Sequence, residues 1–334
     1  MKVEIAGASY EIRPYRDTDE EDVVALHRLV FGPEGRRALG EREWRYRRNP
    51  AGGHLTSVCV SEDGRIVCAY AGIPLRGQLL GSPATFALVV DTMTHPEFRG
   101  AVLGRRGLLV RTALDWKERY VGEGGVAFCY GAPEARNSRL GSLALGYRLW
   151  DEIGSYGRVV EDSVIKRIRR GLGDRRLVRV DEVGPEADDL WSRAARRYPT
   201  AVIRDRAYLS WRYRGGAERD YVILAARSGT DWSGWLVLAV RDDATTIADA
   251  ILPSDPDAAD ALLYRAVLES LARGATWLEG WATVDSDLGR LYERSGFARR
   301  PQEGTYFACH VAAAADEAAV RRTLFIQPGD TDAV

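Results

Sequence analysis

The residues best suited to chemistry in this 334-residue sequence are the arginines and glycines of one short loop. The stretch HPEFRGAVLGRRG at 95–107 contains Arg99, Gly100, Gly104, Arg105 and Arg106. Glycines let backbone amides turn inward, and arginines add positive charge, so the loop is suited to bind an anion such as a pyrophosphate. The loop fits neither the Walker phosphate-binding pattern nor the G-x-G-x-x-G dinucleotide fingerprint.

The segments on either side of this loop differ in their hydrophobic pattern. The run FALVVDTMT at 86–94 is almost continuously apolar, which predicts a strand buried on both faces. The run LLVRTALDWKERY at 108–120 has apolar residues at helical spacing. The loop therefore leads from a strand into a helix N-terminus, where free amides and the helix dipole attract anions.

The two halves of the sequence repeat each other. The motif EWRYR at 43–47 returns as SWRYR at 210–214, an offset of 167 residues. In each half a strand-like and a helical segment precede the motif, and a hairpin, a strand–helix–strand pattern and a short glycine-ended helix follow it. This order predicts a tandem duplication of an α+β unit, with domains at 1–168 and 174–325 and a basic linker around 166–176. Because the motif recurs in both halves, we interpret it as a packing element.

Composition narrows the classes of function. Lys plus Arg is 47 and Asp plus Glu is 48, so a net charge of -1 argues against nucleic acid as a partner. No segment has the length of a signal peptide core or a membrane span, which predicts a cytoplasmic protein without a membrane partner. The four cysteines form no CxxC pair, so we expect no metal site. If Asp63 and Gly64 form a two-residue turn, Cys59 lies directly opposite Cys68.

The stretch THPEFRGAVLGRRGLL, together with LGYR at 145–148 and LYERSGF at 291–297, resembles the GNAT superfamily of acyl-CoA-dependent acetyltransferases. The resemblance covers both halves and implies two GNAT-like domains, each a mixed, mostly antiparallel sheet flanked by helices. It implies that the loop amides hold the pyrophosphate of coenzyme A and that the strand edge at Met93 and Thr94 pairs with the pantetheine arm. A coenzyme contact is also implied for Asn137. The loop positions that it assigns are Arg99, Gly100, Ala101, Val102, Leu103, Gly104 and Arg105.

The sequence departs from the family pattern at two places. Val102 stands where the family has a glycine, and its β-branched side chain suits a close approach to phosphate poorly. The equivalent loop of the second half, LPSDPDAAD, has no arginine or glycine but has Asp255, Asp257 and Asp260. Carboxylates repel phosphate and are favourable at a helix N-terminus, so we interpret these aspartates as helix-capping residues of a degenerate second domain.

Catalytic candidates follow from the resemblance. Direct acyl transfer requires a base for the amine, support for the oxyanion and an acid for the leaving thiolate. Asp91 and Glu134 are the candidate bases, although an acid on an apolar strand, such as Asp91, can equally be structural. The tyrosine that the family uses as acid occurs only in the second half, as Tyr292, and Ser142 takes its place in the first half. Tyr130 is the candidate acid and Tyr147 lies nearby in sequence, although each can instead be a packing aromatic.

We therefore expect an N-acyltransferase that moves an acyl group, with acetyl-CoA as the expected co-substrate, to the amine of a small molecule. Two alternatives stay open. The first is a non-catalytic, degenerate GNAT pair that binds acyl-CoA or a partner, and the second is a protein-modifying acetyltransferase. The acceptor, the acyl group and the oligomeric state are not predicted.

Overall fold

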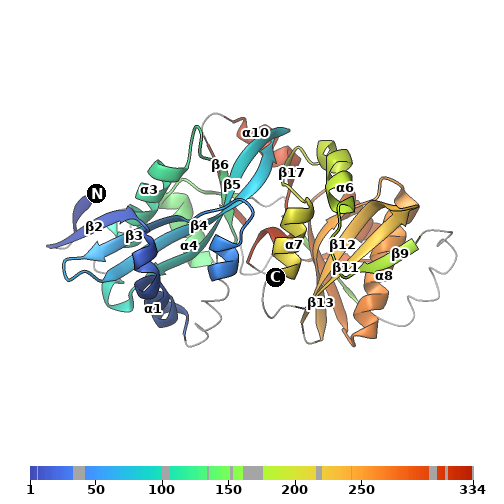
Figure 1. Cartoon of the computed structure of the whole chain (residues 1–334), viewed down its shortest axis with the longest axis horizontal. Coiled ribbons are helices and arrows are strands. Elements are labelled where there is room, and N and C mark those ends of the chain that lie inside the picture. The colour runs from blue at the N-terminus through green and yellow to red at the C-terminus, as the bar shows by residue number, and fades with distance from the viewer. Residues whose placement is uncertain are drawn as a thin grey trace. The chain divides into compact units, whose positions relative to one another are not determined.

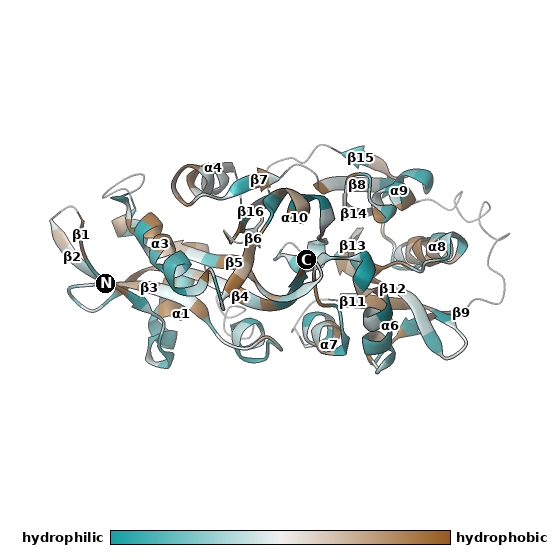
Figure 2. Cartoon of the chain, turned by 90° about the horizontal axis from the view of Figure 1, so that it is seen from above, coloured by the Kyte–Doolittle hydropathy of each residue, from teal (hydrophilic) through white to brown (hydrophobic). Residues whose placement is uncertain are grey.

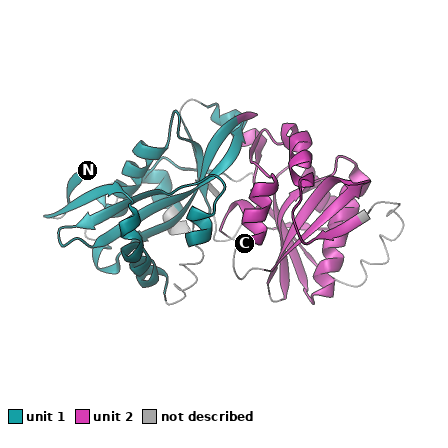
Figure 3. Ribbon diagram, viewed as in Figure 1, with its two compact units in different colours: residues 1–79, 83–150, 305–320 teal, residues 80–82, 151–304, 321–334 magenta. Residues whose placement is uncertain are grey.

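The computed structural model describes residues 1–5, 7–32, 42–99, 106–133, 135–150, 153–160, 176–215, 220–241, 243–300, 307–312 and 315–332. The chain forms two compact units, shown in Figure 3. The first unit comprises Met1–Leu79, Pro83–Trp150 and Thr305–Val320. The second comprises Leu80–Ser82, Asp151–Gly304 and Arg321–Val334.

The first unit contains a mixed sheet whose strands are labelled in Figure 1. Its order is β1 (Lys2–Ile5), β2 (Ala8–Pro14), β3 (Leu55–Ser61), β4 (Ile66–Leu79), β5 (Ser82–Thr94), β6 (Val126–Gly131), β16 (Phe307–Val311) and β7 (Arg148–Trp150). The helical elements described before β7 are η1 (Asp17–Asp19), α1 (Glu20–Phe31), the π-helical turn η2 (Glu43–Arg47), η3 (Pro96–Phe98), α3 (Leu108–Tyr120) and α4 (Ala135–Ala144). A further helix, α10 (Glu317–Thr323), begins in the first unit and ends in the second, because the division between the units falls after Val320.

Helices α1 and α3 cover opposite faces of the first sheet. Val23 of α1 packs in a cluster with Ala69 of β4, whereas Trp116 of α3 packs in a cluster with Tyr70. Adjacent residues of a strand point to opposite faces, so the two helices enclose the sheet between them. The fully buried indole of Trp116 also donates a hydrogen bond to the Leu55 carbonyl at 2.7 Å, which fixes α3 against β3.

The second unit repeats this arrangement. Its sheet has the order β15 (Ala298–Arg300), β8 (Ile153–Val159), β14 (Trp277–Thr283), β13 (Ala244–Ile251), β12 (Asp231–Arg241), β11 (Asp220–Ser228) and β9 (Arg176–Val180). Its helical elements are α6 (Glu186–Ala194), η6 (Ala195–Arg197), α7 (Arg206–Arg214), α8 (Pro256–Ala272), α9 (Asp287–Arg294) and η7 (Pro328–Asp330). Apolar residues of α8 and α9 share one buried cluster with β11, β12 and β13, and Figure 2 shows α8 lying along this sheet.

The expected fold class is confirmed. Most neighbouring strands are antiparallel, and each sheet has one parallel pair at its centre, β5 with β6 and β13 with β14. If the first sheet is read from β2 and the second from β9, equivalent strands follow one another in the same order. This match supports the duplication that the repeated motif predicts.

The domain boundaries that we expected from the sequence differ from the compact units. Strand β8 follows β7 in the sequence but pairs with β14 and β15 in the second sheet. Conversely, β16 follows β15 but pairs with β6 and β7 in the first sheet. Each half therefore gives one strand to the other sheet, because a strand pattern predicts a strand but not the edge with which it pairs. The expected linker lies mostly outside the described residues.

Other expectations can be compared directly with the fold. Cys59 lies opposite Cys68 in the β3–β4 register, as predicted, and all four cysteines are buried and form no disulfide. The sequence LFIQPGDTDAV at 324–334 is compatible with either a further strand or a loose tail, and it begins with a short strand, β17 (Leu324–Phe325), which pairs with β10 (Thr200–Val202). In the part of the chain that is described, no helix is long and apolar enough to cross a membrane.

Candidate functional site

The strands β5 and β6 separate before β5 ends. Their parallel register runs from Thr85 opposite Val126 to Leu88 opposite Tyr130, and β6 stops one residue later, at Gly131. Strand β5 continues for six more residues, to Thr94. Within the described residues, β5 has no β6 partner beyond Leu88, and backbone groups at such a strand edge can pair with a ligand.

The end of β5 holds the two strand residues predicted to bind the coenzyme. Met93 is buried beneath α1, and the Thr94 carbonyl accepts a hydrogen bond of 3.0 Å from Nε of Arg99. Nδ1 of His95 accepts a hydrogen bond from the Glu97 amide at 3.3 Å, so His95, which precedes Pro96, shapes the start of the loop. The remaining predicted loop residues, Gly100, Ala101, Val102, Leu103, Gly104 and Arg105, lie outside the described residues.

Asp91 lies at the centre of a buried charge cluster. Its two carboxylate oxygens accept hydrogen bonds from Tyr46 Oη at 2.8 Å and from an Arg45 guanidinium nitrogen at 3.1 Å. His27 and Arg42 lie 3.8 and 3.9 Å away. Burial acts to raise the pKa of Asp91, but these positive and donor groups outweigh it and lower that pKa below the ordinary value. The backbone of Asp91 has a φ of +48°, which is strained for a residue with a side chain.

A second layer of contacts supports this cluster. Arg42 pairs with Glu20 at 2.9 Å, and the Glu20 carboxylate also accepts a hydrogen bond from Tyr15. His54 is stacked between the rings of Tyr15 and Tyr46, with both centroid distances at 4.5 Å. Burial and the positive charge of Arg42 lower the pKa of His54, so the imidazole between the two rings is neutral at pH 7.

Sequence reasoning missed most of this cluster. The motif EWRYR was interpreted as packing, yet Arg45 and Tyr46 are the groups that bind Asp91. The recurrence of this motif in both halves was the signal that could have revealed its role. An arginine and a tyrosine present in both copies suggest that each copy binds an equivalent acidic residue. His27 and His54 carried no such signal.

The other candidate catalytic residues have different surroundings. Tyr130 is fully buried at the last β6 position that pairs with β5, and its ring stacks on Phe128. Cys129, beside it, is also buried, and burial raises the pKa of this thiol to about 11, which makes it a poor nucleophile. Glu134 lies outside the described residues. Asn137 lies in α4, but its side chain is not part of the described structure.

The equivalent loop of the second unit has the expected helix caps. The Asp255 carboxylate is the N-cap of α8 and accepts a hydrogen bond from the Asp257 amide at 3.1 Å. Asp260 pairs with Arg294 at 2.8 Å. These contacts confirm the capping role of Asp255, while Asp260 belongs to a surface ion pair instead.

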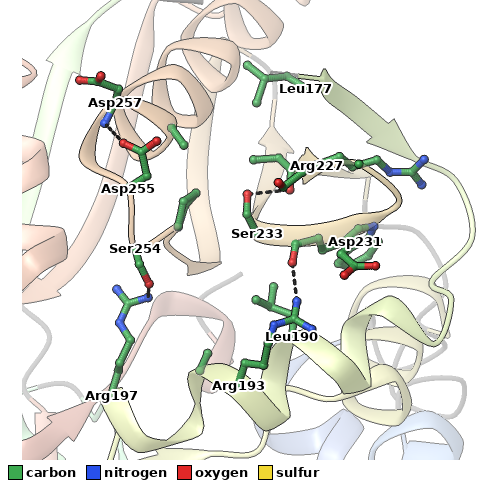
Figure 4. Close-up of a pocket in the computed structure, with 17 residues that line it drawn as sticks. Leu177, Leu190, Arg193, Arg197, Arg227, Asp231, Ser233, Ser254, Asp255 and Asp257 are labelled. Atoms are coloured by element: carbon green, nitrogen blue, oxygen red, sulfur yellow. Dashed lines mark hydrogen bonds between the residues drawn. The ribbon is translucent and has the colours of Figure 1, made fainter. Parts of the chain in front are cut away.

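A cavity of about 890 Å³ lies beside this loop. Figure 4 shows Arg193 and Arg197 rising from the α6–η6 segment, with Asp255 and Asp257 across the cavity. Both arginines bind backbone carbonyls, of Trp232 at 2.7 Å and of Leu252 at 2.8 Å. The lining side chains include three arginines and three aspartates, so their formal charges cancel. The cavity therefore offers no net positive formal charge to an anion.

The comparisons with known proteins point to one family. Residues 11–135 match a family model described as an acetyltransferase (GNAT) domain. No curated protein matches the chain in sequence.

Several solved structures share the fold over most of the chain. One is a GCN5-related N-acetyltransferase from Anabaena variabilis, with 15% identity, a TM-score of 0.63, and coverage of 90% of this chain and 72% of that one. Another, from Kribbella flavida, has 13% identity, a TM-score of 0.62 and coverage of 90% and 71%. Saccharomyces cerevisiae N-myristoyltransferase with bound myristoyl-CoA has 11% identity, a TM-score of 0.55 and coverage of 90% and 82%. At these identities the likeness shows a shared fold.

Proposed function

We propose that the chain is an N-acyltransferase that moves an acyl group from coenzyme A to the amine of a small molecule, because residues 11–135 match an acetyltransferase (GNAT) domain. One observation carries the proposal. The family match at 11–135 covers the part of the first unit with the arginine and glycine loop, and there β5 extends six residues beyond the last residue that pairs with β6. We also propose acetyl-CoA as the acyl donor and the cytoplasm as the compartment.

The first unit suits a coenzyme with a pyrophosphate and an amide-containing arm. We propose that residues 99–105 bind the pyrophosphate and that the backbone at Met93 and Thr94 pairs with the pantetheine amides. The gap beyond Leu88 supports this assignment, since it leaves strand edge available for pairing. We further propose that Asn137 contacts the coenzyme. Acyl-CoA supplies an activated thioester, so the protein has to orient the amine and move protons.

We propose Asp91 and Glu134 as candidate bases and Tyr130 as the acid. The contacts of Asp91 favour Glu134 as the group that accepts the proton of the amine. Asp91 already accepts hydrogen bonds from Tyr46 and Arg45, and its lowered pKa makes it a weak base at neutral pH. Asp91 then serves to hold the end of β5 in place.

Calorimetric titration with acetyl-CoA tests the proposed donor site. We expect the unmodified protein to bind acetyl-CoA and a double variant, Arg99→Ala with Arg105→Ala, to lose at least tenfold in affinity. The matched control is Arg28→Ala with Arg111→Ala, which removes the same charge from exposed positions on α1 and α3. A protein that binds neither acetyl-CoA nor longer acyl-CoAs would overturn the proposal.

A panel of small amines, with release of free coenzyme A as the readout, tests the transfer step. Turnover with an amine supports the transferase. Binding of acetyl-CoA without turnover on small amines or on peptides supports the alternative function, a non-catalytic acyl-CoA-binding protein. The full pairing of Asp91 is the observation that favours this alternative.

A further inference from the structure

Residues 324–331 of the second unit lie between two strands that separate. Strands β13 and β14 pair from Ala244 opposite Trp277 to Ile247 opposite Gly280, and beyond these residues each pairs only with its other neighbour. The gap between β13 and β14 is the counterpart of the gap between β5 and β6. At the β14 side of this gap, the hydroxyl of Thr283 donates a hydrogen bond of 2.9 Å to the Leu324 carbonyl.

The same segment reaches β13 through a close contact at Gly329. A Cβ atom at this position would lie 2.9 Å from the Ala248 carbonyl oxygen and 2.0 Å from Oη of Tyr213. Only glycine fits this contact without a shift of the segment. Residues 324–331 therefore cross the gap from the end of β14 to the edge of β13.

Two buried arginines anchor the segment. Arg204 is fully buried and binds the carboxylates of Asp249 on β13, at 2.8 Å, and of Asp330 in the segment, at 2.5 Å. Arg212, from the repeated motif, donates to the carbonyls of Gly329 at 2.7 Å and Thr331 at 2.9 Å. Since a buried charge pair is costly to break, these contacts hold the segment firmly.

One polar group at the gap is not satisfied by the segment. The hydroxyl of Tyr292 is fully buried and, within the described residues, has no hydrogen-bond partner. A Cβ atom added at Gly280, the last β14 residue that pairs with β13, would lie 2.4 Å from it. A buried hydroxyl without a partner is costly, so the segment crosses the gap without satisfying every polar group beside it.

We infer that residues 324–331 are a built-in occupant of the β13–β14 gap and that the second unit is thereby closed to acyl-CoA. The arm of an acyl-CoA paired with β13 would need the space of Gly329 and Asp330. The chain then takes one acyl-CoA, in its first unit. The identity of this ligand rests on the proposed function, whereas occupation of the gap rests on the contacts above.

Amide hydrogen exchange on the full chain tests the occupation. We expect residues 326–331 of the unmodified protein to exchange as slowly as the buried strands β11 and β12. Gly329→Ala removes no charge but forces the segment from Tyr213, and Asp330→Asn removes one anchor of Arg204. In both variants we expect exchange at 326–331 to rise about tenfold or more while β11 and β12 stay protected. Asp332→Asn, at an exposed position two residues further on, is the control and should match the unmodified protein.

The number of acetyl-CoA molecules bound per chain completes the test. One per chain supports the inference, and two per chain overturn it. Fast exchange at 326–331 in the unmodified protein, or unchanged exchange in both variants, would overturn it as well. If Gly329→Ala also exposes β11 and β12, the milder Asp330→Asn decides. If no acetyl-CoA binds while the exchange pattern is as expected, the proposed function fails and the occupation of the gap stands.

Discussion

The hydroxyl of Tyr46 donates a hydrogen bond of 2.8 Å to Oδ2 of Asp91, and this contact ties the first copy of the repeated motif to strand β5. Tyr213 makes the same contact with Asp249 of β13, at 2.9 Å, in the second copy. The duplication has therefore kept a tyrosine–aspartate pair at equivalent places in both sheets. The groups around Asp91 differ from those around Asp249, so we expect the two carboxylates to affect stability differently.

Replacing Tyr46 by phenylalanine removes one donor from a buried carboxylate. A hydrogen bond to a charged group contributes about 1.5–3 kcal/mol, so we expect Tyr46→Phe to lower the free energy of unfolding by about 2 kcal/mol, measured by urea denaturation. Tyr120→Phe is the control, because Tyr120 donates to a neutral carbonyl, that of Thr56, at 3.2 Å. Its expected cost is smaller, about 0.5–1 kcal/mol. Equal costs for the two variants would contradict a charged role for the Tyr46 contact.

Asp91→Asn leaves Arg45, Arg42 and His27 without their shared carboxylate. Breaking a buried ion pair on one side typically costs about 3 kcal/mol or more, and we expect a loss of this size in the free energy of unfolding at pH 7. The folded-state pKa of Asp91 is lowered, so its contribution is present above the unfolded pKa near 4 and is lost as the pH falls through the folded value. The stability difference between the two proteins should stay level from pH 5 to 8 and shrink below pH 4.

Asp249→Asn should show the opposite pH dependence. Burial, assisted by the charge of Asp330, outweighs the attraction of Arg204 and raises the pKa of Asp249 to about 6. An acid with a raised folded pKa binds its proton more tightly in the folded state, so its ionisation lowers stability as the pH rises from 4 to 6. The stability of Asp249→Asn relative to the unmodified protein should therefore increase over this range, by about 3 kcal/mol at most. A relative stability that falls over the same range would contradict this assignment.

The fold could be predicted to a large extent because its signals are local. The apolar run ending at Thr94, the helical spacing after Gly107 and the repeated motif each predict an element that the structure contains. The exchange of β8 and β16 could not be predicted, because a strand of either half has the same alternating pattern whichever sheet it joins.

The site was less predictable than the fold. Asp91 could be singled out as the one acid on an apolar strand, but its partners come from η2 and α1, far away in sequence. The sequence at 324–331 is compatible with either a strand or a loose tail, and only its contacts with Arg204 and Arg212 show how it is buried. Long-range charge pairs leave no periodic signal, so the sequence predicts neither of these arrangements.

The cysteines should be unreactive in the folded protein. All four are buried, and burial raises the pKa of Cys59 to about 12 and of Cys68 to about 11. Thiols that stay protonated and shielded do not attack disulfide reagents. We expect no reaction with Ellman's reagent until guanidinium is added, and then four thiols per chain. Rapid reaction of one native thiol would contradict the burial, while its absence lets the same reagent report coenzyme A release without background.

Tyr130→Phe tests the proposed acid with this readout. Loss of a proton donor typically slows a reaction about 100-fold, so we expect kcat to fall by that order while the Kd of acetyl-CoA is unchanged. Tyr147→Phe is the control, since Tyr147 is another buried tyrosine, whose hydroxyl lies 3.1 Å from that of Tyr70. We expect Tyr147→Phe to be less stable but to keep kcat within about twofold, because the Tyr147 hydroxyl makes its contacts inside the core, with Tyr70 and Cys129. A kcat that is unchanged in Tyr130→Phe would leave Tyr130 with a packing role alone and assign proton delivery to another group or to water.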